Sequence, residues 1–298
     1  MKFRKLAAAL LIGSLALAAC GKEGSPAAPG GDTAAAALSY PVATDVALTG
    51  SKTFDAMKTK GRVTIGVKED QPGIGFKGPD GKYAGFDIEI AKAVAKELGV
   101  DEGNIEFVTT VSANREPFIQ QGKVDLVVAS YTINDDRKKK VSFAGPYYVA
   151  GQDLLVRTDE SAITGPDTLA GKKVCSVSGS TPAKRITTDY PQAKLQEFDA
   201  YSKCVAALIG KSVDAVSTDD IILAGYAAQY AGQLKVVGKP FSKEPYGIGL
   251  AKDDKKGRDA INDALQKIFT DGRYKAAWDA TLGTGGTPAP TPPALDRY

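Results

Sequence analysis

The sequence contains no histidine and only three cysteines among its 298 residues. Without histidine, neither a Ser-His-Asp nor a Cys-His catalytic arrangement can form, and histidine-based metal sites are excluded. Three cysteines are also too few for a zinc site built from four cysteine ligands. These absences favour a protein that is not an enzyme and that carries neither a metal nor another cofactor.

A surplus of one charge sign is also lacking. The formal charge is +3 at pH 7, and three positive charges, Lys2, Arg4 and Lys5, lie within residues 1–19. A chain without that segment is formally neutral, so nothing in it favours a nucleic-acid partner. The basic run 137–140 is local and is typical of a solvated helix face. We expect the protein to be a monomer.

The N-terminus resembles a bacterial lipoprotein signal. Basic residues precede an apolar run, Leu6–Leu17, which is too short to span a bilayer, and small residues precede Cys20. The resemblance implies a signal peptide at 1–19 and cleavage before Cys20. Lipid on the Cys20 sulfur would then anchor the protein at the outer face of the cell membrane. An ordinary signal peptide with an incidental cysteine is the alternative.

If Cys20 carries lipid, Cys175 and Cys204 remain as an even pair in an exported chain. Such a pair predicts one disulfide, and two free thiols are the alternative. Residues 20–50 begin with a stretch of Gly, Ala and Pro that predicts a flexible tether. The Pro-rich segment 284–298 is predicted to be a disordered tail.

Between these ends, strand patterns alternate with helix patterns, which predicts an α/β fold with mostly parallel sheets. In residues 87–98, for example, Ile90, Val94 and Leu98 form one apolar stripe. The predicted strands are 62–67, 105–109, 124–129, 153–156, 173–177, 215–217 and 247–251. The predicted helices are 87–98, 113–121, 182–188, 202–210, 219–230 and those within 255–281.

Two arginines flank the predicted strand 124–129, and two hydroxyl residues follow it. Arg115 precedes the strand, while Ser130, Thr132 and Arg137 come after it. Hydroxyls and a guanidinium at the carboxyl end of a strand suit a carboxylate. Two arginines near one pocket favour a ligand with more than one carboxylate.

Three motifs together resemble the solute-binding proteins that serve ABC importers for polar amino acids. The motifs are Gly85–Ala91, Ser130–Arg137 with Phe143–Tyr148, and Gly171–Val174 with Ser178–Thr181. The resemblance covers about residues 53–282. It implies a two-lobe fold of the type II periplasmic-binding kind, with crossings at 148–153 and 243–247. Lobe 1 would comprise 51–149 and 247–283, and lobe 2 would comprise 150–246.

The resemblance implies that Arg137 binds the ligand α-carboxylate, because a planar guanidinium matches a carboxylate in bidentate fashion. Thr132 would add its hydroxyl and N–H, and the Ser130 carbonyl would face the α-ammonium. From the second lobe, the amides of Ser180 and Thr181 would bind the same carboxylate. Thr181 followed by proline is also typical of a helix N-cap, and both roles are compatible.

The resemblance also implies that Asp219, beside Thr218, pairs with the ligand ammonium, and a buried carboxylate there would need such a cation. Simple N-capping is the alternative role for Asp219, and Asp220 is the alternative partner if the register is shifted by one residue.

The side-chain pocket is predicted from Lys68, Ser112 and Arg115. A Ser-x-x-Arg element and a cation after the first strand resemble members that bind acidic amino acids, and two cations favour glutamate or aspartate. In the alternative, Lys68 pairs with Glu69 or Asp70 and Arg115 pairs with Glu116 on the surface. Glutamine then becomes competitive.

Two other functions share this fold. A cyclohexadienyl-dehydratase-like enzyme would need a general acid, for which Glu69, Asp70 or Glu116 could serve. A sensor domain would need a separate partner protein. The leading hypothesis is a lipid-anchored protein that captures glutamate by lobe closure and delivers it to an ABC transporter permease.

Overall fold

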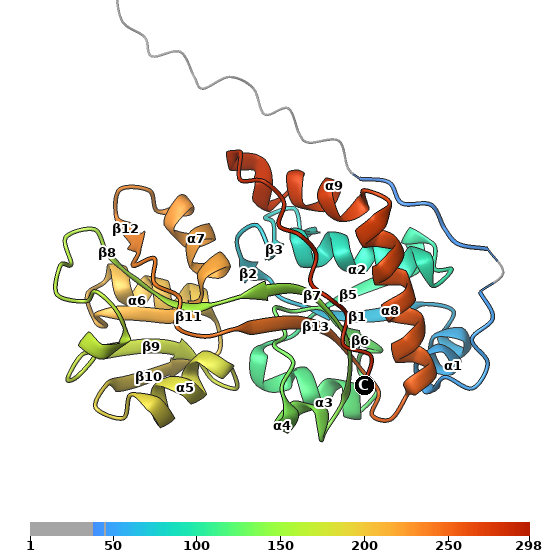
Figure 1. Ribbon diagram of the computed structural model, residues 1–298, viewed down its shortest axis with the longest axis horizontal. Helices are drawn as coiled ribbons and strands as arrows, with labels where there is room; N and C mark the ends of the chain where they lie inside the picture. The colour runs from blue at the N-terminus through green and yellow to red at the C-terminus, as the bar shows by residue number, and fades with distance from the viewer. Residues whose placement is uncertain (1–37, 45) are drawn as a thin grey trace, which may run out of the picture. The chain divides into compact units, whose positions relative to one another are not determined.

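The computed structural model describes residues 38–44 and 46–298 (Figure 1). The predicted signal peptide, Cys20 and most of the predicted tether lie outside the described residues. Within the described ranges, no helix combines the length and the apolar character that a membrane crossing requires.

Two five-stranded sheets form the centres of two lobes. The first sheet has the order β5-β1-β6-β13-β7, and the second has the order β10-β9-β11-β8-β12. The first contains β1 (Val63–Val67), β5 (Ile105–Thr109), β6 (Leu126–Val127), β7 (Ser142–Ala150) and β13 (Glu244–Leu250). The second contains β8 (Gln152–Arg157), β9 (Lys173–Val177), β10 (Lys194–Phe198), β11 (Ala215–Asp219) and β12 (Leu234–Val236).

The predicted two-lobe α/β fold is confirmed, but the sheets are mixed. Strands β5, β1 and β6 pair in parallel, as do β10, β9 and β11. The remaining strands of each sheet pair antiparallel. The expectation of mostly parallel sheets was wrong for these strands because they connect the lobes directly and not through a βαβ crossover.

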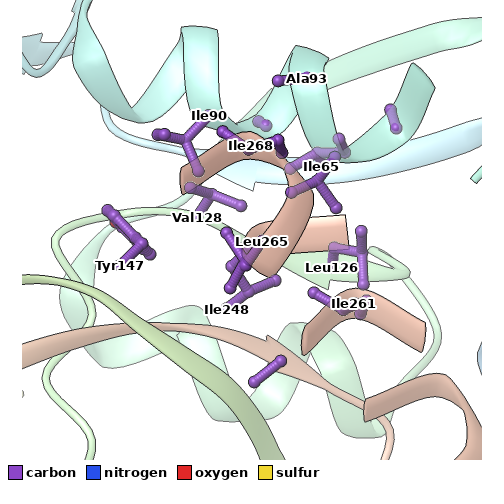
Figure 2. Packing of buried hydrophobic residues seen from close by; sticks show 14 of the residues in the cluster. Ile65, Ile90, Ala93, Leu126, Val128, Tyr147, Ile248, Ile261, Leu265 and Ile268 are labelled. Atoms are coloured by element: carbon purple, nitrogen blue, oxygen red, sulfur yellow. The ribbon is translucent and has the colours of Figure 1, made fainter. Parts of the chain in front are cut away.

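Helices cover both faces of the first sheet in lobe 1. Apolar side chains of α2 (Phe86–Glu97) and α8 (Lys255–Thr270) meet those of β1, β6 and β13 in the main core, where Ile65, Ile90 and Leu265 are fully buried (Figure 2). A smaller cluster on the other face includes Ile119 of α3 (Arg115–Gln120). The other helices of this lobe are α1 (Lys52–Lys60), α4 (Asp135–Lys138) and α9 (Arg273–Asp279).

Lobe 2 has the same layered construction. Its helices are α5 (Thr181–Asp189), α6 (Tyr201–Ile209) and α7 (Asp220–Gln229). One apolar cluster joins α6 and α7 to the sheet, and another joins α5 to its other face. Single 3-10 turns lie at Glu102–Asn104, Ser112–Asn114, Pro166–Thr168 and Leu282–Gly285.

The chain crosses between the lobes at two places. Strand β7 of the first sheet passes through Gly151 directly into β8 of the second. The return leads from β12 into β13, which lies between β6 and β7. The first crossing, at Gly151, falls within the predicted segment 148–153, whereas the connection 237–243 between β12 and β13 meets the predicted segment 243–247 only at its last residue. The boundaries 149/150 and 246/247 stay predictions.

A small antiparallel sheet in lobe 1 was not predicted. It consists of β2 (Asp70–Gln71), β3 (Gly75–Lys77) and β4 (Tyr83–Ala84). These strands are too short to show a sequence period.

The predicted disorder of the tail 284–298 was wrong. The Asp296 N–H donates to the Gly145 carbonyl at 2.7 Å, and the Phe143 N–H donates to the Tyr298 hydroxyl at 2.9 Å. Lys138 forms an ion pair with Asp296 at 2.7 Å and lies over the Tyr298 ring. The last residues include aromatic and charged side chains, so the tail binds along the exposed edge of β7 despite its proline content.

The predicted disulfide is present between Cys175 on β9 and Cys204 on α6. It closes a loop within lobe 2, with a sequence separation of 29 between the two cysteines. In the loop-entropy description, such a crosslink stabilises the folded state by roughly 3 kcal/mol.

We predict that replacing both cysteines, Cys175→Ala with Cys204→Ala, lowers the free energy of unfolding by about 3 kcal/mol. Urea denaturation followed by circular dichroism measures the change. Reduction of the unchanged protein should lower the midpoint similarly. Equal midpoints for the oxidised protein and the double variant would contradict a stabilising disulfide.

Candidate functional site

A narrow cavity of about 10 Å³ lies between the lobes, and eight of the ten predicted ligand-binding residues line it. Lobe 1 contributes Ser112, Arg115, Ser130 and Thr132, and lobe 2 contributes Ser180, Thr181, Thr218 and Asp219. Pro182, Tyr201 and Ile222 complete the lining. The other two predicted residues, Lys68 and Arg137, are buried and bonded to lining residues.

Arg115 is buried where η2 (Ser112–Asn114) meets α3, with only 2% of its surface exposed. Its Nη1 donates to the carbonyls of Ala129 and Ser130 at 3.2 and 3.1 Å. Its Nη2 donates to the Gly179 carbonyl of lobe 2 at 3.3 Å, and the guanidinium lies over the Tyr131 ring. Among the described residues, no carboxylate forms an ion pair with it. The predicted surface alternative, a pair with Glu116, is therefore wrong.

Lys68 is also buried, immediately after β1. Its Nζ donates to the Ser112 hydroxyl at 2.8 Å. Burial, aided by the positive charge of Arg115, lowers the pKa of Lys68 to about 7. The alternative of a surface pair with Glu69 or Asp70 is wrong, because no ion pair of Lys68 occurs among the described residues and its side chain points to Ser112.

Arg137 is held beside the cavity by α4. The Asn134 side chain caps this helix by accepting the Arg137 N–H at 2.9 Å. The guanidinium donates to the Thr132 carbonyl at 2.7 Å and to the Gly179 carbonyl at 3.0 Å, and its Nε lies 3.3 Å from Glu116. Burial, with the charge of Arg115, lowers the Arg137 pKa to about 10.

The expected solvated helix face at 137–140 was therefore wrong for Arg137, which is 7% exposed. It holds for Lys139 and Lys140, which are exposed. The role of Arg137 as the α-carboxylate ligand stays a prediction, because Arg137 does not line the cavity and its donors are bonded to backbone carbonyls.

In lobe 2, the N-cap of α5 is Ser180 and not Thr181. The Ser180 hydroxyl accepts the Ala183 N–H at 3.1 Å, and Pro182 is the second helical residue. The predicted N-cap, Thr181, lies one residue C-terminal to the observed one, because serine and threonine are nearly equivalent as caps. The Thr181 hydroxyl instead donates to Glu244 at 2.7 Å, and the Ser180 N–H donates to the Val177 carbonyl.

Asp219 ends β11 with an oxygen atom free for a ligand. Its Oδ2 accepts the Tyr246 hydroxyl at 2.5 Å, while its buried Oδ1 has no partner among the described residues. Burial, and then the charge of Glu244, raise the pKa of Asp219 to about 7. The nearby Thr218 hydroxyl is likewise buried and unpartnered in the described part. Together they offer two acceptors to a cationic group.

The two alternatives for this position can now be separated. Asp219 is at the N-cap of α7 but makes no side-chain capping bond. Asp220 instead accepts the Ile221 N–H at 2.7 Å and the Gly151 N–H at 3.2 Å. Asp220 therefore supports the first crossing, and Asp219 is the carboxylate that lines the cavity.

Residues outside the predicted set hold the site in shape. Asp87 accepts the Ser130 N–H and the Tyr147 hydroxyl, both at 2.7 Å, and so fixes Ser130 in a left-handed conformation with φ of 42°. Burial raises the pKa of Asp87 to about 6. Asp87 belongs to the motif Gly85–Ala91, but its role was not predicted. Its partner Ser130 lies 43 residues away, and a single sequence carries no signal for such a distant contact. The Tyr246 contact with Asp219 was missed for the same reason.

A cavity that joins buried cations to a carboxylate between two α/β lobes is typical of a binding protein for small zwitterions. Residues 63–283 match the family model of bacterial extracellular solute-binding proteins, family 3. The chain belongs to this family.

Several relatives have named ligands. Glutamate-binding protein GluB of Corynebacterium glutamicum is 44% identical over 244 residues, covering 78% of this chain and 83% of its own. The glutamine-binding protein GlnH of Bacillus subtilis is 35% identical, covering 92% and 94%. A solved ancestral arginine-binding protein bound to glutamine has a TM-score of 0.71 and 37% identity, covering 75% and 98%. The two curated relatives carry the names of binding proteins.

We predict that Asp219→Asn stabilises the ligand-free protein at pH 8 by on the order of 1–3 kcal/mol. The folded-state pKa of Asp219, about 7, lies above the ordinary value of 3.8 for an aspartate, so its ionisation costs stability as the pH rises through this range. Urea denaturation at pH 4 and pH 8 measures the effect. The exposed Asp167→Asn is the control, with a change within about 0.5 kcal/mol. A loss of stability in Asp219→Asn at pH 8 would contradict the claim that the buried, unpaired carboxylate of Asp219 destabilises the protein.

Proposed function

We propose that the protein captures glutamate outside the cytoplasm by lobe closure and delivers it to an ABC transporter permease. The observation that carries this proposal is the pair of buried cations, Lys68 and Arg115, on the two sides of Ser112. No carboxylate of the described residues forms an ion pair with either. Buried charges need partners, and a ligand carboxylate would supply one for both.

The opposite end of the cavity suits the ammonium of an amino acid. The free Asp219 Oδ1 and the Thr218 hydroxyl can accept its hydrogens. Arg137, Thr132 and the Thr181 N–H would then bind the α-carboxylate, since the Ser180 N–H already donates to the Val177 carbonyl. In this role Arg137 exchanges a hydrogen bond to a neutral carbonyl for one to a carboxylate, which is stronger because both partners are charged.

The relatives support the same ligand class. GluB, at 44% identity, is named for glutamate, whereas GlnH, at 35%, is named for glutamine. Glutamine would satisfy Asp219 and Arg137 equally well. It would leave the two cations of the side-chain pocket without a counter-charge, so the pair Lys68–Arg115 favours glutamate.

The remaining parts of the proposal concern location. Lipid on Cys20 would anchor the protein at the outer face of the cell membrane, and residues 20–50 would serve as the tether. An oxidised Cys175–Cys204 pair fits an extracytoplasmic compartment. Lobe 1 would comprise 51–149 and 247–283, lobe 2 would comprise 150–246, and the two would close around a single ligand.

We predict that the protein, unfolded and refolded to remove bound ligand, binds glutamate more tightly than aspartate, glutamine or arginine in calorimetric titrations. Arg115→Ala should weaken glutamate binding roughly 100-fold, since it removes one of the two positive charges that would pair with the side-chain carboxylate of the ligand. The exposed Arg62→Ala should bind as the unchanged protein does. Glutamine binding as tight as that of glutamate, or an unaffected Arg115→Ala, would refute the acidic ligand.

We further predict that glutamate binding at pH 8 takes up nearly one proton per ligand. Lys68, with a pKa of about 7, is mostly neutral at that pH, and a ligand carboxylate raises its pKa. Asp219 is then mostly ionised and contributes little. Titrations in buffers of different ionisation enthalpy count the protons. Lys68→Met should abolish the uptake and the exposed Lys77→Met should retain it, whereas equal uptake in both variants would exclude Lys68 as its source.

A further inference from the structure

The hairpin of β2 and β3 in lobe 1 inserts an apolar side chain into lobe 2. Ile74, at the turn, is 1% exposed and belongs to the buried cluster formed by α6, α7 and the second sheet. The same cluster includes Ile222, Leu223 and Tyr226 of α7. None of these contacts involves the ligand-binding charges.

The hairpin is attached rigidly to lobe 1. The N–H groups of Phe86 and Asp87, at the start of α2, donate to the carbonyls of Gly73 and Ile74, both at 2.9 Å. Gly85 has a φ of 121°, and a Cβ there would lie 2.4 Å from the Ile74 carbonyl. The hairpin must therefore move together with α2, and Ile74 must leave lobe 2 when the lobes separate.

Lobe 2 receives the hairpin at a glycine in the middle of α7. A Cβ on Gly225 would lie 2.4 Å from the Pro72 carbonyl oxygen, which is closer than any atom contact allows. Gly225 has an ordinary helical φ, and alanine is the better helix former. The glycine thus weakens the helix but permits the backbone of lobe 1 to approach it. Figure 1 shows α7 and β2 as neighbours.

Polar contacts surround this apolar insertion. The Tyr226 hydroxyl donates to the Asp70 carbonyl, and the Ser202 N–H donates to the Asp70 carboxylate at 3.1 Å. On the far side of the cavity, the contacts between the lobes are polar: Arg115 and Arg137 donate to the Gly179 carbonyl, and the exposed Lys184 pairs with Asp136 at 2.7 Å. Exposed pairs contribute little to stability, whereas a buried isoleucine contributes substantially.

We propose that Pro72, Ile74 and Gly225 form a latch that holds the lobes closed and so sets how slowly the ligand leaves. The apolar insertion stabilises the closed state whether or not the cavity is filled. Ligand release requires Ile74 to enter water. The identity of the ligand rests on the proposed function, but the latch itself does not.

The first test is Gly225→Ala in the full chain. The added methyl clashes only in the closed state and favours the helix in the open state. Without ligand, small-angle X-ray scattering should give a larger radius of gyration than for the unchanged protein. The dissociation rate of glutamate in stopped-flow measurements should rise at least about tenfold, since affinity changes at one interface lie mostly in dissociation. The urea midpoint should not fall.

Ile74→Ala is the second variant and should open the lobes in the same direction without any clash. Gly103→Ala is the matched control, because a Cβ at Gly103 meets nothing within 4 Å. If Gly225→Ala and Ile74→Ala both leave the radius of gyration and the dissociation rate of glutamate unchanged, the proposal is overturned. Open lobes in Gly225→Ala, together with no glutamate binding by the unchanged protein, would support the latch while refuting the proposed ligand.

Discussion

One backbone oxygen links the two lobes at the site. The Gly179 carbonyl accepts hydrogen bonds from both Arg115 and Arg137, at 3.3 and 3.0 Å. The same guanidiniums bind the carbonyls of Ser130 and Thr132, so the loop after β6 is shaped by the two arginines. Burying two like charges is costly, and carbonyl dipoles only partly offset the cost. The arrangement therefore depends on closure, which brings the Gly179 oxygen to both arginines.

Eight residues named from the sequence line the cavity, because they lie at strand ends and helix starts that local patterns reveal. Ser130, Thr132 and Asp219 each follow a buried strand, where side chains of an α/β sheet converge. What local patterns could not show were contacts between distant segments, such as Asp87 with Ser130 or Tyr246 with Asp219. The order of the tail was missed for the same reason, since its bonding partners lie far away in the chain.

The site also reduces the stability of the fold. Asp219, Asp87 and Lys68 are buried, and burial shifts the pKa of each toward its neutral form. Buried ionisable groups with shifted pKa values are typical of functional sites, and they lower the stability of a protein that has no ligand bound. The disulfide between Cys175 and Cys204 lies directly behind this region, on β9 and α6 of lobe 2. It stabilises the lobe that contains the unpaired carboxylate.

The position of β13 between β6 and β7 bears on the order in which the chain folds. Lobe 2 is continuous from β8 to β12, so all of its strands and both cysteines are available once residue 236 has appeared. In lobe 1, β7 has no neighbour in the first sheet until residues 244–250 arrive. A chain that emerges N-terminus first therefore completes its second lobe before its first. Until then, the backbone groups of β7 lack a strand partner, and such an unpaired edge favours aggregation.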